Sequence, residues 1–364
     1  MSRVLKDETT LAGWGSAQLS RLATACGLED RASELEALFL DLLGKYGDTS
    51  RSIPPQWRSN VCDDYTPFEY SIAIDQTALD FRLLVESVGA EPTMRSAQEE
   101  AEKATERLAA SLGVTSERLR RVASLFRSED PQGLFSRWHA VEFGRGRSTS
   151  AKVYLNPLVH GDDDGAPVVE KALLELGMAE VWDAVCVARK RGRLDEVKYF
   201  SLDLADSSVA RVKVYLRHHD ILPREWEESL SGCNGYEEGV VSRFCEAMTG
   251  EAECLAARPV FSCLAAVSDQ PGVTSTAYIP MSAFAPNDAV ARTRTTQYLE
   301  SLSIPSAPFE ECLSALTTRP LESSSGLISY VSTKVRAKSP RVTIYLSPES
   351  YSVAPPQGQK AVNP

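Results

Sequence analysis

A short strand-like pattern recurs four times along the chain and constrains its fold more than any other feature. The pattern is Lys or Thr, any residue, Tyr and then an aliphatic residue, with its tyrosines at Tyr154, Tyr215, Tyr278 and Tyr345. Successive tyrosines are 61, 63 and 67 residues apart. Self-similarity at such a spacing predicts one supersecondary unit that is repeated through the chain.

Each period contains two strand-like runs and stretches with the helical spacing of Leu and Ala. These runs predict that each unit is an antiparallel hairpin with helices. An earlier copy begins at Phe68-Glu69-Tyr70, which gives about five units. Closure of the resulting strands removes the exposed edges of an open sheet. We expect an α+β fold, a barrel of about ten antiparallel strands inside a ring of helices. It would form a single domain over residues 1–352 with a disordered tail at 353–364; two separate α+β domains are the alternative.

The two faces of these strands differ in chemistry. One face carries Lys152 with Tyr154, then Lys213 with Tyr215, whereas the opposite face, at positions 153, 155, 212, 214 and 216, is Val or Leu. Side chains at i and i+2 share one face of a strand. Because the aliphatic face must pack against the helices, we expect the cations and tyrosines to line the barrel interior, which is wide enough to enclose a ligand.

This combination of side chains indicates a particular class of ligand. Clustered Lys and Arg recognise phosphate or diphosphate, and a ring of tyrosine faces stabilises a cation. Together they predict an allylic diphosphate that ionises while the aromatic rings exclude water. A non-catalytic barrel that only binds an anionic isoprenoid or another phosphate is the alternative from a different class.

Composition excludes other partners. The formal charge of −11 and the pI near 5.1 argue against nucleic acid and against anionic membrane surfaces. The chain shows no membrane span and no secretory signal, and its eight cysteines form no CxxC motif. We therefore expect a cytoplasmic protein with buried free thiols. We expect no metal site at His218-His219-Asp220 or in the turn Asp162-Asp-Asp164, and a solvated surface at Arg189–Arg193.

A set of short motifs points to a known family. The motifs are Thr66-Pro-Phe-Glu69-Tyr-Ser, Ala-Lys152-Val-Tyr154, Arg211-Val-Lys213-Val-Tyr215, Thr-Ala-Tyr278-Ile-Pro, and Ser-Tyr330 through Arg336 to Tyr345. In order and spacing, over about residues 60–350, the sequence resembles the indole prenyltransferases of the dimethylallyltryptophan synthase type. The resemblance implies the αββα (ABBA) prenyltransferase barrel and a metal-independent enzyme that needs no cofactor and uses dimethylallyl diphosphate as co-substrate.

The resemblance also implies roles for individual residues. Glu69 corresponds to the carboxylate that accepts the indole N–H. The cations that correspond to the diphosphate-binding set are Arg82, Lys152, Arg211, Lys213 and Arg336. The tyrosines that correspond to the cation shield are Tyr154, Tyr215, Tyr278, Tyr330 and Tyr345.

The sequence departs from the family pattern at two places. Members that prenylate C4 of tryptophan carry a lysine on the strand before the first Lys-x-Tyr, and this chain has none in Arg137–Phe143. A hairpin that pairs Phe143 with Ser148 would place His139 opposite Lys152, so we predict His139 as the base; a slip by one residue would present Glu142 or Trp138 instead. The other departure is Thr276, where the family often has glutamine.

These observations predict an enzyme that transfers a dimethylallyl group to the indole ring of L-tryptophan, at a benzene-ring carbon, with C6 as the specific expectation. Other acceptors stay open: an indolactam, a tryptophan-derived cyclic dipeptide, or the oxygen of tyrosine. The sequence does not indicate an oligomeric state.

Overall fold

The computed structural model describes residues 8–250, 253–335 and 339–351, and its centre is a closed barrel of ten antiparallel strands. Neighbours around the barrel follow the order β1-β10-β9-β8-β7-β6-β5-β4-β3-β2. This confirms the predicted barrel. The strands are β1 Phe68–Ile74, β2 Leu79–Glu86, β3 Arg137–Gly144, β4 Ser150–Leu155, β5 Asp195–Asp203, β6 Val212–His218, β7 Val260–Val267, β8 Gln270–Pro280, β9 Ile328–Lys334 and β10 Val342–Leu346.

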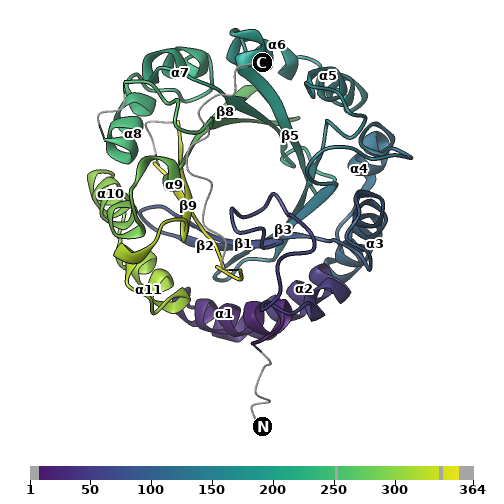
Figure 1. The fold of residues 1–364 in the computed structure, drawn as a ribbon. Helices are drawn as coiled ribbons and strands as arrows, with labels where there is room; N and C mark the ends of the chain where they lie inside the picture. Colours follow the sequence, from purple (N-terminus) through teal and green to yellow (C-terminus); the bar gives the residue numbers. More distant parts are fainter. Residues whose placement is uncertain (1–7, 251–252, 336–338, 352–364) are drawn as a thin grey trace.

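A ring of helices surrounds the barrel (Figure 1). Helices α1 and α2 precede the first hairpin, and each of the four intervals between successive hairpins contains further helices. The predicted repeat of hairpin and helices is therefore present. The helices are α1 Leu11–Ala25, α2 Ala32–Leu43, α3 Met94–Leu112, α4 Glu117–Val122, α5 Ala166–Glu175, α6 Val181–Ala188, α7 Pro223–Leu230, α8 Val240–Thr249, α9 Met281–Phe284, α10 Asp288–Ser301 and α11 Ala307–Leu316.

Local sequence sets the helix ends. At the start of α3 the hydroxyl of Thr93 accepts the backbone N–H of Ser96 at 3.2 Å. The helix stops at Gly113, whose φ of 63° lies in the left-handed region that glycine tolerates. This glycine is the break that the amphipathic pattern predicts between two helices, here α3 and α4. The tail at 353–364 lies outside the described residues.

The main hydrophobic core lies between the barrel wall and the helices. Outward side chains such as Phe68, Ile72, Phe81 and Val153 are fully buried there, because the aliphatic side of each strand must be covered by a helix. The inward side chains are left to form a chamber of different composition. None of the helices within the described residues is long and apolar enough to cross a membrane.

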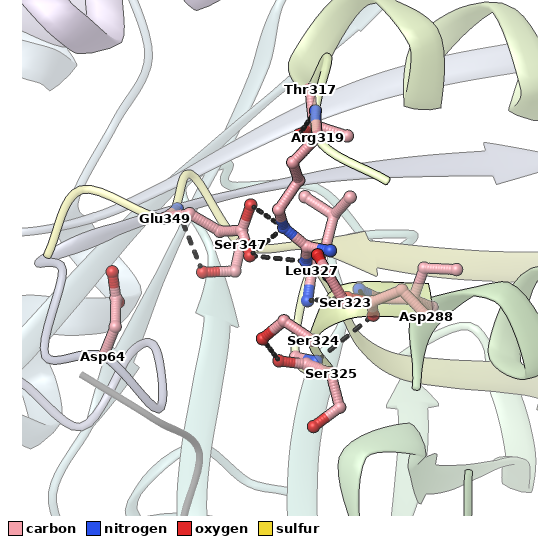
Figure 2. A network of polar contacts seen from close by, with 12 residues as sticks. Asp64, Asp288, Thr317, Arg319, Ser323, Ser324, Ser325, Leu327, Ser347 and Glu349 are labelled. Carbon is pink, nitrogen blue, oxygen red and sulfur yellow. Dashed lines mark hydrogen bonds and ion pairs between the residues drawn. The ribbon is translucent and has the colours of Figure 1, made fainter. Parts of the chain in front are cut away.

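A buried polar network ties the end of β10 to the start of α10 (Figure 2). Asp288, only 1% exposed, accepts backbone N–H groups from Gly326, Leu327 and Ile328 at 3.1–3.3 Å. Arg319 bridges Asp288 and Glu349, with 2.6 Å between its Nη2 and a Glu349 oxygen. The network fixes the entry to β9 and the exit from β10, the two strands that complete the barrel.

Residues 49–67, here called the mouth segment, run between the helices and β1 and lie over one opening of the barrel, in dark blue-purple in Figure 1. The carboxylate of Glu86 on β2 accepts the indole N–H of Trp57 at 3.0 Å and the hydroxyl of Ser59 at 2.5 Å. The Tyr46 hydroxyl accepts the backbone N–H of Trp57 at 3.0 Å. These bonds hold the segment against the rim.

Candidate active site

The strand register places the predicted cations and tyrosines on the inner face of the barrel. Tyr215 pairs with Tyr199 on one side and Cys263 on the other, while Lys213 pairs with Ser201 and Ala265. Directly opposed residues in a sheet share a face. The same reasoning around the barrel gathers these inner side chains: Arg82, Lys152, Tyr154, Lys213, Tyr215, Tyr278, Tyr330 and Tyr345.

Four of the predicted tyrosines form a chain of ring contacts. The centroids of Tyr154 and Tyr215 are 5.6 Å apart, those of Tyr215 and Tyr278 6.0 Å, and those of Tyr278 and Tyr345 5.9 Å. Burial raises the pKa of all four phenols, so they are neutral near pH 7. A band of neutral aromatic faces is suited to stabilising a cation.

A second layer of aromatic rings lies nearer the mouth. Tyr330, also predicted, lies 6.5 Å from Tyr345 and 6.2 Å from Phe261 between ring centroids. Phe261 stacks on Tyr199 at 5.8 Å, which in turn lies 5.1 Å from Trp138. The sequence reasoning missed Tyr199, Phe261 and the ring role of Trp138, because none of the three lies in the Lys-x-Tyr pattern.

Arg82, Lys152, Arg211 and Lys213 lie near one another, since each contributes to the electrostatics of the others. None of the four lines the cavity that contains Glu69 and the four-tyrosine band. Arg82 forms an ion pair with Glu142, with 2.6 Å between Nε and Oε2. Arg211 forms one with Asp203 at 2.7 Å. The neighbouring cations hold the pKa of Glu142 at about 2, against the opposing effect of burial.

Lys152 and Lys213 differ from the two arginines. Neither ammonium has an ion pair within the part of the chain that the structure describes. Burial, together with neighbouring cations, lowers the pKa of Lys152 well below its usual value and that of Lys213 to about 8. An incoming anion would reverse that shift. These two groups are therefore available to a phosphate oxygen.

One predicted cation is not placed by the structure. Arg336 lies outside the described residues. Arg341, which the sequence reasoning did not select, sits at the start of β10 at the cation end of the barrel. It forms ion pairs with Asp75 and with the buried Asp80, and the nearby Arg82 contributes to lowering its pKa after burial.

Glu69 lies on β1 with its carboxylate in the barrel interior. The hydroxyl of Ser329 donates a hydrogen bond to Glu69 Oε1 at 2.7 Å. Burial raises the pKa of Glu69 to about 8, and the Ser329 bond opposes this rise. Ser329 is the extra residue of a β-bulge on β9, since Tyr345 pairs with Tyr330 and Leu346 with Ile328. The bulge turns a side chain inward that strict alternation would turn outward.

A cavity of about 220 Å³ occupies the mouth half of the barrel and joins these groups. Glu69 and Ser329 line it on one side, and the two aromatic layers line most of the rest. The mouth segment closes it through residues 60–63. A cavity of this size, bounded by rings and a few polar groups, fits a small aromatic ligand.

Three cations lie at the rim of this cavity. Arg258 forms a two-pronged ion pair with Asp63 of the mouth segment at 2.6 and 2.7 Å, and its guanidinium lies 5.6 Å from the Tyr330 ring centroid. Arg217 pairs with Glu196. Lys198 is the extra residue of a bulge on β5, and burial lowers its pKa to about 8. All three side chains line the cavity.

The prediction for His139 is wrong in its geometry. Ala140, not His139, lies opposite Lys152, because the β3–β4 turn is one residue longer than expected and Glu142 pairs with Ser150. His139 therefore faces the helices, where its Nε2 lies 2.8 Å from the hydroxyl of Thr105 on α3. Burial lowers its pKa to about 3. Glu142 and Trp138 take the inner face instead, as the alternative register predicted.

No group of three or more His, Cys, Asp or Glu that could hold a metal ion occurs in the described residues. The two ring nitrogens of His218 form hydrogen bonds with the Asp195 carboxylate at 2.6 Å and the Ser262 hydroxyl at 2.9 Å. Nε2 of His219 forms one with the Glu196 carboxylate at 3.0 Å. In the Asp162–Asp164 turn, Asp164 caps Ala166 and pairs with Arg189. These polar residues serve the local structure.

Comparison with known proteins then assigns the family. The sequence model described as tryptophan dimethylallyltransferase matches residues 35–231, more than half of the chain. The chain belongs to the tryptophan dimethylallyltransferase family. The resemblance seen in the sequence and the prediction of a prenyltransferase are both confirmed.

Solved structures agree with membership of the tryptophan dimethylallyltransferase family. The 6-dimethylallyltryptophan synthase from Micromonospora olivasterospora, solved with DMASPP and Trp, is 31% identical over 95% of this chain and 99% of its own, with a TM-score of 0.90. The 5-dimethylallyltryptophan synthase from Streptomyces coelicolor is 30% identical over 95% and 100%, with a TM-score of 0.86. The prenyltransferase NotF, at 16% identity over 92% and 93% and a TM-score of 0.73, shares the fold.

Proposed function

We propose that this protein transfers the dimethylallyl group of dimethylallyl diphosphate to a benzene-ring carbon of L-tryptophan. One observation carries the proposal. A band of four tyrosines lines the cavity that contains the Glu69 carboxylate. Lys152 and Lys213, which have no ion pair among the described residues, precede two of these tyrosines on their strands and do not line that cavity. An allylic diphosphate needs cations at one end and an indole needs an acceptor at the other, with shielded space between them.

Different residues of the barrel interior act on different steps of the proposed reaction. The ammonium groups of Lys152 and Lys213, with Arg82 and Arg211, take up charge on the diphosphate as its C–O bond breaks. The tyrosine faces stabilise the allyl cation and keep water away from it. The indole ring attacks this cation and forms the new C–C bond. The ring proton then leaves to a base in the interior, and His139 is excluded from that role by its position behind the wall.

Glu69 orients the acceptor. In its ionised form the carboxylate accepts the indole N–H, and the Ser329 hydrogen bond fixes one of its oxygens, leaving the other for the substrate. A hydrogen bond to a charged group in such a dry site is worth about 2–4 kcal/mol in the barrier. Regiochemistry follows from which ring carbon this contact turns toward the cation.

The rim of the cavity favours a free amino acid as acceptor. Lys198, Arg217 and Arg258 line the same cavity as Glu69. The two arginines already pair with Glu196 and Asp63, whereas Lys198 has no ion pair among the described residues, and an amino-acid carboxylate would complement its charge. An indolactam or a cyclic dipeptide lacks that carboxylate. Tyrosine carries it, but tyrosine has no indole N–H for Glu69 to accept. L-tryptophan has both groups, an indole N–H for Glu69 and a carboxylate for the cationic rim.

The position of attachment is proposed as C6. The solved relatives include both a 6- and a 5-dimethylallyltryptophan synthase at about the same identity, 31% and 30%. Both act on the benzene ring by their names. The absence of a lysine on β3, the residue that accompanies C4 prenylation, supports a benzene-ring position other than C4.

The test is incubation of the protein with dimethylallyl diphosphate and each acceptor, with and without EDTA, read by mass spectrometry and by NMR of the product. We expect tryptophan to gain one C5H8 unit at C6, in EDTA as well, since no metal takes part in the proposed steps. Tryptamine, which lacks the carboxylate, should react far more slowly. Attachment at C5 would refute the position, faster turnover of a cyclic dipeptide would refute the acceptor, and complete loss of activity in EDTA would refute the metal-free mechanism.

Variants of Glu69 test the role of the carboxylate. Glu69→Ala should lower kcat/KM by about 30- to 900-fold, the equivalent of about 2–4 kcal/mol. Glu69→Gln keeps the shape and one acceptor oxygen, and so serves as the matched control with a smaller loss. Near-normal turnover by the alanine variant would remove this role from Glu69.

A further inference from the structure

Two thiols face each other where the ring of helices closes. α1 and α11, the first and last helices of the described residues, lie side by side in Figure 1. Cys26 ends α1 and Cys312 lies within α11, and their sulfur atoms are 3.5 Å apart. Both are free thiols and both are buried, Cys312 completely and Cys26 at 6% exposure.

The backbone holds Cys26 in this position. After α1 the backbone N–H of Leu28 bonds to the carbonyl of Ala23 at 2.7 Å, and Gly27 adopts φ 63°. This is the Schellman arrangement that closes a helix. Arg21, one turn earlier, donates from Nε to the carbonyl of Ala315 at the end of α11 at 2.7 Å. The Arg21 bond therefore joins α1 to α11 beside the thiol pair.

We propose that Cys26 and Cys312 form a redox modification site, at which a hydroperoxide converts the two thiols into an intrachain disulfide. A disulfide bond is about 2.05 Å long, so the sulfur atoms must approach by about 1.5 Å. Side-chain rotation with a small helix shift is sufficient for such a movement. No residue of the active site takes part.

A second cavity gives the oxidant a path. It has a volume of about 590 Å³ and is lined by the end of α1, including Cys26, by the β1–β2 turn and by the start of α11. Cys312 does not line it. Cys26 is therefore the thiol that meets the oxidant, and Cys312 is the thiol that resolves the product.

The chemistry balances with hydrogen peroxide as the oxidant. The Cys26 sulfur attacks one oxygen and the O–O bond breaks, giving a sulfenic acid and one water. The Cys312 sulfur then attacks the Cys26 sulfur, the S–O bond breaks, and a second water leaves. In total two thiols lose two electrons and two protons, and one peroxide becomes two waters.

The surroundings of the thiol pair determine how fast it reacts and with which oxidants. The hydrogen bond to Cys312 and burial raise the pKa of the Cys26 thiol, so its thiolate is scarce at neutral pH. The reaction is therefore slow, and because both thiols are buried the oxidant must be small. The bond would join residues 286 positions apart, and cross-links over long loops stabilise a fold most in the chain-entropy description.

The experiment uses the full chain with the two exposed cysteines replaced, Cys186→Ser and Cys254→Ser. Six of the eight cysteines then remain. The protein is treated with hydrogen peroxide, quenched with catalase, unfolded in iodoacetamide and digested without reduction. We expect the count of alkylatable thiols to fall from six to four, and a linked peptide pair that contains Cys26 and Cys312.

Two further readouts separate the disulfide from general damage. Oxidation should raise Tm by about 5 °C or more, and kcat/KM should stay within about twofold because the pair lies outside the barrel wall. The matched control adds Cys312→Ala, which should show neither the linked peptide nor the gain in Tm. Sulfenic or sulfinic acid at Cys26 without a cross-link would overturn the proposal. So would unreacted Cys26 and Cys312 under conditions that oxidise the same chain after unfolding.

Discussion

Replacing Ser329 by alanine removes a hydroxyl that donates a hydrogen bond to Glu69 at 2.7 Å. A hydrogen bond to a charged group contributes about 1.5–3 kcal/mol, and this one favours the ionised carboxylate. Its loss disfavours ionisation of Glu69 by a factor of about 10 to 150. The pKa of Glu69, already raised to about 8 by burial, must then rise further.

The consequence for activity depends on pH. The carboxylate is the form that accepts the indole N–H, so kcat/KM should increase with pH up to about 8 in the unmodified protein. At pH 7 only about one-tenth of the protein has Glu69 ionised. Ser329→Ala should lower kcat/KM at pH 7 by about 10- to 150-fold, and raising the pH should recover much of that loss.

The assay is kcat/KM for tryptophan between about pH 5.5 and 9.5, at saturating dimethylallyl diphosphate. Ser329→Thr keeps the hydroxyl and is the matched control, with a profile close to that of the unmodified protein. If the alanine variant shows the same midpoint and a uniform decrease at every pH, Ser329 is only a packing residue and the reasoning fails.

Three other outcomes are expected. Lys213→Ala should raise KM for dimethylallyl diphosphate about tenfold or more while changing KM for tryptophan little, in steady-state kinetics; a change confined to tryptophan would contradict the placement of Lys213. Because the pKa of free Lys213 is about 8, diphosphate binding at pH 8 should take up protons, which calorimetry in buffers of different ionisation enthalpy measures; binding without proton uptake would mean that Lys213 does not meet the diphosphate. His139→Asn should retain activity within about threefold after correction for folded protein, since His139 contacts Thr105 behind the wall; loss of turnover in a folded variant would restore it as a base.

The sequence was sufficient to predict the barrel and most of the interior because both depend on strict alternation. Lys152 with Tyr154 and Lys213 with Tyr215 lie at i and i+2 on regular strands, and their shared face follows from pleating alone. The burial of the aliphatic residues between them then determines which face turns inward. No knowledge of strand pairing is needed for this step.

Alternation fails where a strand bulges or a turn changes length. Ser329 and Lys198 are extra residues at bulges, and each reaches the cavity against the phase of its strand. A β3–β4 turn that pairs Phe143 with Ser148 would turn His139 inward, but the turn has one additional residue and His139 faces the helices. Bulge positions and turn lengths are decided by pairing across strands, which a single sequence does not display.

The interior also resolves the contrast between the overall charge of −11 and an anionic substrate. Glu142 and Asp203 already neutralise Arg82 and Arg211, which lets two guanidinium groups be buried at a tolerable cost in desolvation. Lys152 and Lys213 lack such partners within the described chain, and burial disfavours their charged forms. A diphosphate would satisfy both ammonium groups at once. The uncompensated positive charge at this end of the barrel therefore comes from the lysines, and the two paired arginines assist them in binding the diphosphate.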